Sequence, residues 1–289
     1  MRVPFNFAVE NYVLAPATWY RVGGPARLAL FPRDIKEAVA AHQWMLEQPV
    51  RQLVLGKGSN VLISDAGFPG VVLMTEKLAK IEWLGDNRYR IEAGLKLDRL
   101  VREVILTNNY EGTGALAGIP GSAGGAMFMN AGTVNGSTCD FLESADIAGR
   151  DGLRTVRIEK GQCAYRSQSF CGDGGLIVRG TFRFTPSAKD QQAVYDHYVQ
   201  RRREKQPQGC CCGSVFRNPP GEHAGRLIEA CGLKGERRGG AVISEMHANF
   251  IMNDNAATFE DILYLINLCK QRVRERFGIE LHEEVRVIA

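Results

Sequence analysis

Two glycine-rich stretches, "LGKGSN" at residues 55–60 and "GIPGSAGG" at residues 118–125, have compositions that could bind a phosphate-bearing ligand. The first is neither a Walker A loop nor a complete G-x-G-x-x-G motif, because Val61 stands where the third glycine belongs. Consecutive N–H groups in such a turn can still hold phosphate oxygens. The glycines of the second stretch suit backbone laid against a large planar or diphosphate-bearing ligand such as FAD. The alternatives are a plain tight turn for the first stretch and a flexible lid for the second.

Three polar side chains stand in settings that could support proton transfer or charge stabilisation. Ser214, in "GSVFRNP", could donate a proton, although a single serine more often caps a turn. Arg166, in "YRSQSF", could hold an anion or a developing oxyanion, although most arginines form surface ion pairs. Glu284, in "EEVRV", would face the opposite side of a strand from Glu283, and an inward carboxylate needs a partner or a function.

The periodicity of apolar residues predicts the elements that position these groups. We expect capping boxes at Asp34 with Glu37 and at Thr258 with Asp261, and a C-cap at Gly278. Helices are predicted at residues 33–48, 97–109, 191–205, 221–232 and 258–277. Strands are predicted at residues 50–55, 70–74, 89–94, 144–149, 176–184 and 280–289.

Length and composition indicate a globular protein of one large domain or two to three modest ones. The chain has 289 residues, 45% of them hydrophobic, and a net charge of +4, which calls for no nucleic-acid partner. No stretch is long enough to cross a bilayer, so we expect a cytoplasmic protein with no membrane partner. Three regions are expected: 1–78, to which 279–289 return, then 79–187, then 188–278.

Eight cysteines are present, and none forms a C-x-x-C pair. Three of them are adjacent, at Cys210–Cys212, which is poor geometry for a disulfide ladder or a zinc site. We therefore expect reduced thiols and no metal. Cys231 and Cys269 are interpreted as core residues on helices.

Eight motifs occur in the order and spacing of one family, over nearly the whole chain. They are "ATWYRVGGPA", "LVLGKGSNVLISDAGFPGVV", "LAGIPGSAGGAMFMNAG", "YRSQSF", "GSVFRNP", "AGRLIEACGLKG", "GGAVISEMHANFIMN" and "EEVRVIA". The chain resembles the UDP-N-acetylenolpyruvoylglucosamine reductases, flavoenzymes of peptidoglycan precursor synthesis. The resemblance implies an α+β fold, in which two subdomains of the vanillyl-alcohol-oxidase type hold non-covalent FAD and a third domain binds the substrate.

The implied reaction is a reduction in two halves. NADPH gives hydride to FAD, and UDP-N-acetylglucosamine enolpyruvate is then reduced to UDP-N-acetylmuramate, a step needed for cell-wall biogenesis, cell shape and cell division. By the same resemblance, Ser214 donates a proton, while Arg166 and Glu284 stabilise an enol form. The implied substrate-binding residues are Lys205, Asn218 and Asn249. The implied cofactor-binding residues are Arg21, Gly56, Lys57, Gly58, Ser59, Asn60, Gly118, Ile119, Gly121, Ser122, Gly124, Gly125, Asn130, Ala131 and Gly132.

Two features depart from the family pattern. Cys210–Cys212 stand where a proline and small residues are usual, and some relatives use a thiol as the proton donor, although Ser214 aligns cleanly. The segment between Arg166 and Phe184 is short, which indicates the subgroup that lacks a long tyrosine-bearing loop. We expect a monomer.

Two other functions compete with the reductase interpretation of the sequence. An oxidase of the same fold often tethers its flavin through His or Cys, but none of the five histidines lies in a glycine loop. A non-enzymatic anion or nucleic-acid binder would bind in a strongly salt-dependent manner. Such a binder would need a stripe of aromatic and basic residues, and the sequence has none.

Overall fold

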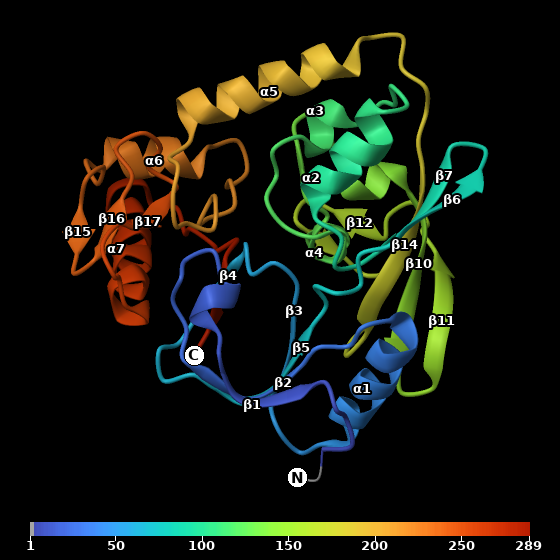
Figure 1. Cartoon of the computed structure of the whole chain (residues 1–289). Coiled ribbons are helices and arrows are strands. Elements are labelled where there is room, and N and C mark those ends of the chain that lie inside the picture. The colour runs from blue at the N-terminus through green and yellow to red at the C-terminus, as the bar shows by residue number, and fades with distance from the viewer. Residues whose placement is uncertain (1–2) are drawn as a thin grey trace. The chain divides into compact units, whose positions relative to one another are not determined.

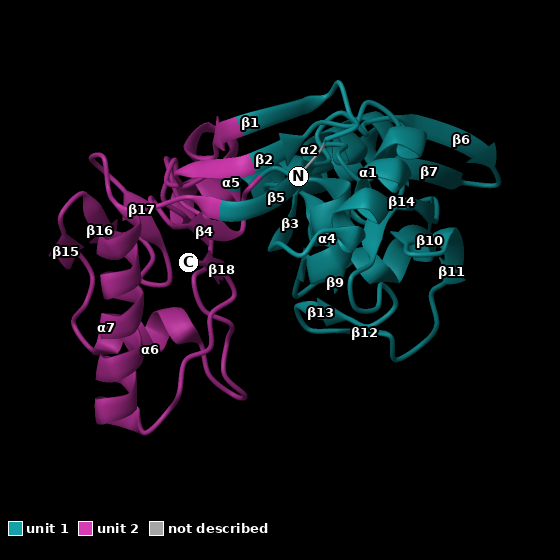
Figure 2. Cartoon of the chain, turned by 90° about the horizontal axis from the view of Figure 1, so that it is seen from below, with its two compact units in different colours: residues 1–10, 28–57, 69–200 teal, residues 11–27, 58–68, 201–289 magenta. Residues whose placement is uncertain are grey.

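The computed structural model describes residues 3–289, which form two compact units (Figures 1 and 2). Unit 1 contains the residues up to Glu10, Leu28–Lys57 and Pro69–Gln200. Unit 2 contains Asn11–Arg27, Gly58–Phe68 and Arg201–Ala289. The chain therefore passes between the units several times, and the division into three regions predicted from the sequence stays a prediction.

The main sheet of unit 1 is antiparallel and has five strands in the order β11-β10-β14-β7-β6. The strands are β6 (Ile81–Gly85), β7 (Arg88–Glu92), β10 (Leu142–Gly149), β11 (Gly152–Arg157) and β14 (Leu176–Arg183). Helix α1 (Ile35–Glu47) contacts β10 (Figure 1). It begins where the sequence predicts, because the side chain of Asp34 accepts the N–H of Glu37 at 2.8 Å.

A second sheet has the strand order β1-β2-β5-β3. Its strands are β1 (Ala8–Val13), β2 (Pro25–Leu30), β3 (Gln52–Leu55) and β5 (Phe68–Met74). The boundary between the units falls inside β1 and β2, as the colour change in Figure 2 shows. Strand β3 runs parallel to β5, and both have buried apolar side chains. The strands expected at residues 50–55 and 70–74 are thus confirmed.

The helical part of unit 1 follows β7 in the chain. Helix α2 (Leu97–Leu100) continues as the wider π-helical segment η2 (Val101–Leu106), whereas the sequence predicts a plain α-helix. The Thr107 hydroxyl donates to the carbonyl of Arg102, five residues back, at 3.0 Å. The spacing of apolar residues in the sequence cannot distinguish a π-helical segment from an α-helix here, because the same apolar side chains are buried in either case. Shorter elements follow: α3 (Thr113–Leu116), α4 (Ala123–Met129), β8 (Gly132–Thr133), β9 (Gly136–Ser137), η3 (Thr138–Phe141), β12 (Cys163–Ala164) and β13 (Ser167–Gln168).

Unit 2 has its own core around helix α7 (Phe259–Phe277), which contacts β16 and β17 (Figure 1). The predicted capping box is confirmed, because Thr258 Oγ1 accepts the N–H of Asp261 and Asp261 Oδ2 accepts the N–H of Thr258. Gly278 ends the helix in the left-handed conformation. Cys269 is buried on α7, as expected, and Cys231 packs partly buried against the same core. The other elements are η1 (Ala15–Ala17), β4 (Val61–Ile63), α6 (Ala224–Ala230), β15 (Arg237–Arg238), β16 (Ala241–Ile243), β17 (Ile251–Asn253) and β18 (Arg286–Ile288).

Helix α5 (Gln191–Lys205) begins in unit 1 and ends in unit 2. Strand β18, near the C-terminus, pairs in parallel with β4. The antiparallel five-stranded sheet and the smaller sheets, combined with helices, make the fold α+β, as the sequence predicts. Within residues 3–289, every helix is too short or too polar to span a bilayer.

Candidate active site

The two glycine-rich loops contact each other within unit 1. Gly56 follows β3, and Ser122 is the N-cap of α4, where its hydroxyl accepts the N–H of Gly125 at 3.3 Å. A Cβ atom at Gly56 would overlap Ser122 Oγ. A larger residue at this position would displace the Ser122 hydroxyl, so these two stretches, which are far apart in the sequence, are in close contact at Gly56.

Close backbone packing accounts for part of the glycine content. A Cβ at Gly124 would lie 2.7 Å from the Cβ of Ala93, and the Gly124 N–H donates to the Ala93 carbonyl at 2.7 Å. Gly118 and Gly121 have φ angles of +67° and +137°, which favour glycine whatever the surroundings. Tight packing and turn geometry therefore require several of these glycines independently of any ligand.

Some donors in these loops are left for a ligand. Within the part of the chain that the structure describes, the N–H groups of Lys57, Gly118 and Gly121 donate no hydrogen bond to a protein atom. Unused N–H groups in glycine turns suit anionic oxygen atoms. These donors fit the diphosphate of a dinucleotide such as FAD.

The remaining residues of the "GKGSN" loop, with Arg21, belong to unit 2. A Cβ at Gly58 would overlap the carbonyl of Ala17. The Asn60 side chain donates to the Glu284 carbonyl at 3.0 Å. Arg21 has a φ of +58°, and its Nη1 donates to the carbonyl of Pro16 at 2.6 Å. Backbone contacts thus fix this second part of the predicted cofactor loop.

Arg166 lies in the two-residue turn between β12 and β13, in unit 1. Its backbone is left-handed, with φ +56°. Its Nη2 donates to the carbonyl of Gly132 at 3.1 Å, and its guanidinium lies 5.0 Å from the centre of the Tyr165 ring. The structure therefore brings Arg166 to Gly132, one of the predicted cofactor residues.

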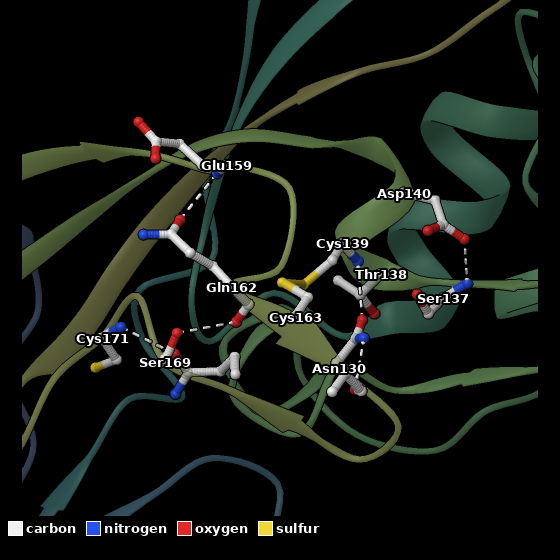
Figure 3. The surroundings of a disulfide bond; sticks show 12 residues. Asn130, Ser137, Thr138, Cys139, Asp140, Glu159, Gln162, Cys163, Ser169 and Cys171 are labelled. Carbon is white, nitrogen blue, oxygen red and sulfur yellow. Dashed lines mark hydrogen bonds between the residues drawn. A yellow bond between two sulfur atoms is a disulfide. The ribbon is translucent and has the colours of Figure 1, made fainter.

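A disulfide between Cys139 and Cys163 holds the base of the Arg166 hairpin (Figure 3). Asn130 supports the same junction, because its Oδ1 accepts the N–H of Cys139 and its Nδ2 donates to the carbonyl of Ala164, both at 3.0 Å. The expectation that all thiols are reduced is wrong for this pair. The two cysteines are 24 residues apart, so only the tertiary fold shows that they meet.

Ser214 follows the three adjacent cysteines in unit 2. Cys211 and Cys212 are buried, and Cys212 Sγ donates to the carbonyl of Val61 at 3.4 Å. Burial raises the pKa of both thiols, which keeps them neutral. These two cysteines therefore pack the segment that leads to Ser214 and are poor candidates for the proton donor.

Glu284 is bonded through its backbone to the segment after Ser214. Its N–H donates to the carbonyl of Val215 at 2.7 Å. The sequence places Glu284 inside a strand, but β18 begins only at Arg286, so this detail is corrected. Before Arg286 the N–H groups of Glu284 and Val285 both bond to the Val215 carbonyl, so this part of the chain is paired with the Ser214 segment and not with β4. Glu283 binds Lys270 at 2.9 Å.

A polar cavity of about 300 Å³ lies in unit 2 and brings together Ser214, Asn218 and Asn249. Lys205, the last residue of α5, is exposed and is not part of this lining. The other lining residues are His223, Gly225, Arg226, Glu229, Met246, His247 and Ala248.

Sequence reasoning missed the two histidines of this cavity. His247 Nδ1 accepts the N–H of Asn249 at 3.2 Å. Burial lowers the pKa of His247, so its neutral form prevails. Asn218 Oδ1 accepts the N–H of Ala224, the first residue of α6, at 3.1 Å. No spacing signal marks either histidine, since neither belongs to a ligand or triad motif.

Comparison with known proteins identifies the family. The profile described as "UDP-N-acetylenolpyruvoylglucosamine reductase, C-terminal domain" matches residues 205–288, and that of "FAD binding domain" matches residues 26–157. A UDP-N-acetylenolpyruvoylglucosamine reductase from Legionella pneumophila (strain Paris) is 42% identical over 284 residues, covering 96% of this chain and 92% of the relative. One from Syntrophotalea carbinolica is 38% identical, covering 95% and 92%.

Solved structures agree with this assignment. The crystal structure of UDP-N-acetylenolpyruvylglucosamine reductase (MurB) from Thermus caldophilus matches with a TM-score of 0.82 at 32% identity, over 98% of both chains. The 6-hydroxy-D-nicotine oxidase of Arthrobacter nicotinovorans, at 16% identity and a TM-score of 0.50 over 64% of this chain and 44% of that one, shares the fold alone. Because the sequence matches run along nearly the full length of the relatives, this chain belongs to the UDP-N-acetylenolpyruvoylglucosamine reductase family.

Proposed function

We propose that this chain reduces UDP-N-acetylglucosamine enolpyruvate to UDP-N-acetylmuramate, with NADPH as the reductant and non-covalently bound FAD as the cofactor. The observation that carries the proposal is the match to reductases of this name along 96% of the chain. The cavity of unit 2 supports it, because Ser214 lines the cavity.

The cofactor would be held by the two glycine-rich loops. When bound, FAD would carry hydride from NADPH to the vinyl carbon of the substrate. The chain's own contribution is to bind and orient. The unused N–H groups of Lys57, Gly118 and Gly121 support this role, since each can donate to a diphosphate oxygen.

Ser214 would donate the proton that completes the reduction. Hydride addition at the terminal vinyl carbon leaves an enolate, which is a strong base, at the adjacent carbon. A serine hydroxyl is a weak acid, but it can protonate a strong base when the two are held in contact. The position of Ser214 on a cavity wall supports this assignment.

Arg166 and Glu284 would stabilise the enol form. The guanidinium of Arg166 supplies positive charge close to the developing oxyanion. Glu284, in its protonated form, would donate a hydrogen bond. Lys205 and Asn218 would bind the phosphates and sugar of the nucleotide, with Asn218 already on the cavity wall.

The experiment follows the visible spectrum of the purified protein in the absence of air. Addition of NADPH should bleach the flavin band, and addition of UDP-N-acetylglucosamine enolpyruvate should restore it. A flavin that bleaches but returns only with oxygen would identify an oxidase instead. A protein that carries no flavin and takes up no added FAD would exclude the proposal.

We also propose that the protein acts as a cytoplasmic monomer. The absence of a membrane-spanning helix among residues 3–289 is compatible with this location. Light scattering of the purified protein should give the mass of one chain, 31.9 kDa. Twice that mass would show a dimer and exclude the monomer.

A further inference from the structure

The carboxamide of Asn249 closes a ring of two hydrogen bonds with the backbone of Phe216. Its Oδ1 accepts the Phe216 N–H at 2.9 Å, and its Nδ2 donates to the Phe216 carbonyl at 2.9 Å. The backbone carbonyl of Asn249 also accepts the N–H of Val215 at 2.8 Å. Three bonds from one residue therefore hold the two residues that follow Ser214.

The same two residues are bonded on their other side to the segment of Glu284. The Val215 carbonyl accepts the N–H of Glu284 at 2.7 Å, and Phe216 forms a bridge with Glu283. Val215 and Phe216 are each 1% exposed, and Asn249 is 3% exposed. Buried polar groups have no water to replace a lost partner, so these bonds fix the backbone firmly.

We propose that Asn249 is a positioning residue, whose clamp on Phe216 sets where the Ser214 hydroxyl stands in the cavity and holds the Glu284 segment against it. The inference rests on the proposed function. It goes beyond the substrate-binding role expected from the sequence, because the carboxamide is engaged with the protein's own backbone on both its donor and its acceptor side.

Asparagine suits this task for a stereochemical reason. A carboxamide presents one donor and one acceptor in a plane, which matches the N–H and the carbonyl of a single residue. The Asn249→Asp variant would lack the donor and would place a carboxylate beside the Phe216 carbonyl. We expect the loop to shift, and a displacement of about 1 Å can slow a reaction by about 100-fold.

The test separates the two half-reactions in the Asn249→Asp variant. Flavin reduction by NADPH should stay within about twofold of the unchanged protein, while reoxidation by UDP-N-acetylglucosamine enolpyruvate should slow by about 100-fold. In steady state the loss should appear in kcat and leave the KM for the sugar nucleotide nearly unchanged. Asn249→Ser serves as a second variant, because it removes the carboxamide without placing a charge beside the Phe216 carbonyl.

Asn253→Asp is the matched control, at the end of β17 in the same unit. Asn253 also clamps backbone, since its Nδ2 donates to the Tyr20 carbonyl at 2.7 Å and its Oδ1 accepts the N–H of Ala257 at 2.8 Å. The side chain of Asn253 thus holds Tyr20 and Ala257, and it makes no hydrogen bond to Val215 or Phe216. The control should lower the unfolding temperature without changing the ratio of the two half-reaction rates.

The outcomes divide cleanly. Selective slowing of reoxidation in both Asn249 variants, absent from the control, supports the inference. Equal slowing of both half-reactions, or a lower unfolding temperature with unchanged rates, overturns it and leaves the proposed function intact. A wild-type flavin that the sugar nucleotide fails to reoxidise overturns the proposed function, and the inference with it.

Discussion

The backbone N–H of Glu284 donates a 2.7 Å hydrogen bond to the carbonyl of Val215, the residue that follows Ser214. Ser214 and Glu284, which are predicted to act on the same substrate, are thus linked through neighbouring backbone of unit 2. They are 70 positions apart in the sequence. The relationship makes the arrangement of these groups a property of the fold of unit 2.

Replacing Ser214 with alanine should impair only the second half-reaction. Flavin reduction by NADPH should remain fast, because it needs no proton from Ser214. Reoxidation by the enolpyruvyl sugar should slow by about 10² to 10⁴, the usual contribution of a positioned acid. Stopped-flow absorbance of the flavin band measures both rates. Ser64→Ala, which removes a turn hydroxyl that accepts the Ala66 N–H, is the control. Two fast half-reactions in Ser214→Ala would rule out the proton-donor role.

Adding one methyl group at Gly56 should weaken flavin binding. The new Cβ of Gly56→Ala would overlap Ser122 Oγ, so the Ser122 hydroxyl would have to turn away and lose its bond to the Gly125 N–H at the start of α4. Overpacking of this kind costs about 1–3 kcal/mol of stability. Gly149→Ala is the control, since nothing lies within 4 Å of its added Cβ. The ratio of flavin to protein after purification measures the effect. Equal flavin content in both variants would contradict the close contact.

Reducing the Cys139–Cys163 disulfide should lower the free energy of unfolding by about 3 kcal/mol, because the bond closes a loop of moderate length. Thermal unfolding with and without a phosphine reductant measures this. A Cys139→Ser/Cys163→Ser double variant should unfold at one temperature in both buffers. If the reductant also leaves the unfolding temperature of the unchanged protein the same, the disulfide contributes nothing to stability.

Stability should fall as the pH drops below about 6.5, in part because of His42. This side chain on α1 is 3% exposed, and burial lowers its pKa in the folded protein. The unfolded chain then binds a proton at a higher pH than the folded chain does. The contribution is therefore complete above the unfolded pKa and is lost as the pH falls toward the lower folded pKa.

The His42→Leu variant tests the origin of this pH dependence. Urea unfolding at about pH 7.5 and about pH 5.5 should show a smaller loss of stability in the variant than in the unchanged protein. Some dependence should remain, because burial also lowers the pKa of His247. An identical loss in both proteins would show that His42 is not responsible.

Sequence reasoning succeeded where the signal is local. Helix α7 was predictable end to end, because Thr258, Asp261 and Gly278 are capping residues whose effect depends on near neighbours in the chain. The strands β3 and β5 were equally clear from short apolar runs. The family motifs then named candidate site residues that local pattern alone left ambiguous.

The features that sequence reasoning missed depend on distant contacts. The partner of Cys139 is Cys163, and the spacing of the two cysteines follows no known motif. His247 enters the cavity because a turn beside Asn249 directs it there. The contact of Gly56 with Ser122 likewise joins segments that are distant in the sequence. The glycine content alone indicated only that some other group lies close to this backbone.

Strand β18 pairs with β4, so a strand made late in synthesis completes a pair whose first member was made much earlier. During synthesis, residues 61–63 must remain without this partner until residues 286–288 emerge. The β4–β18 pair of unit 2 therefore forms only after residue 288 has been made, whereas the five-stranded sheet of unit 1 has all its strands once residue 183 has been made. A nascent chain stalled before residue 286 would carry an unpaired apolar strand at β4, the kind of exposed edge that chaperones bind and that promotes aggregation.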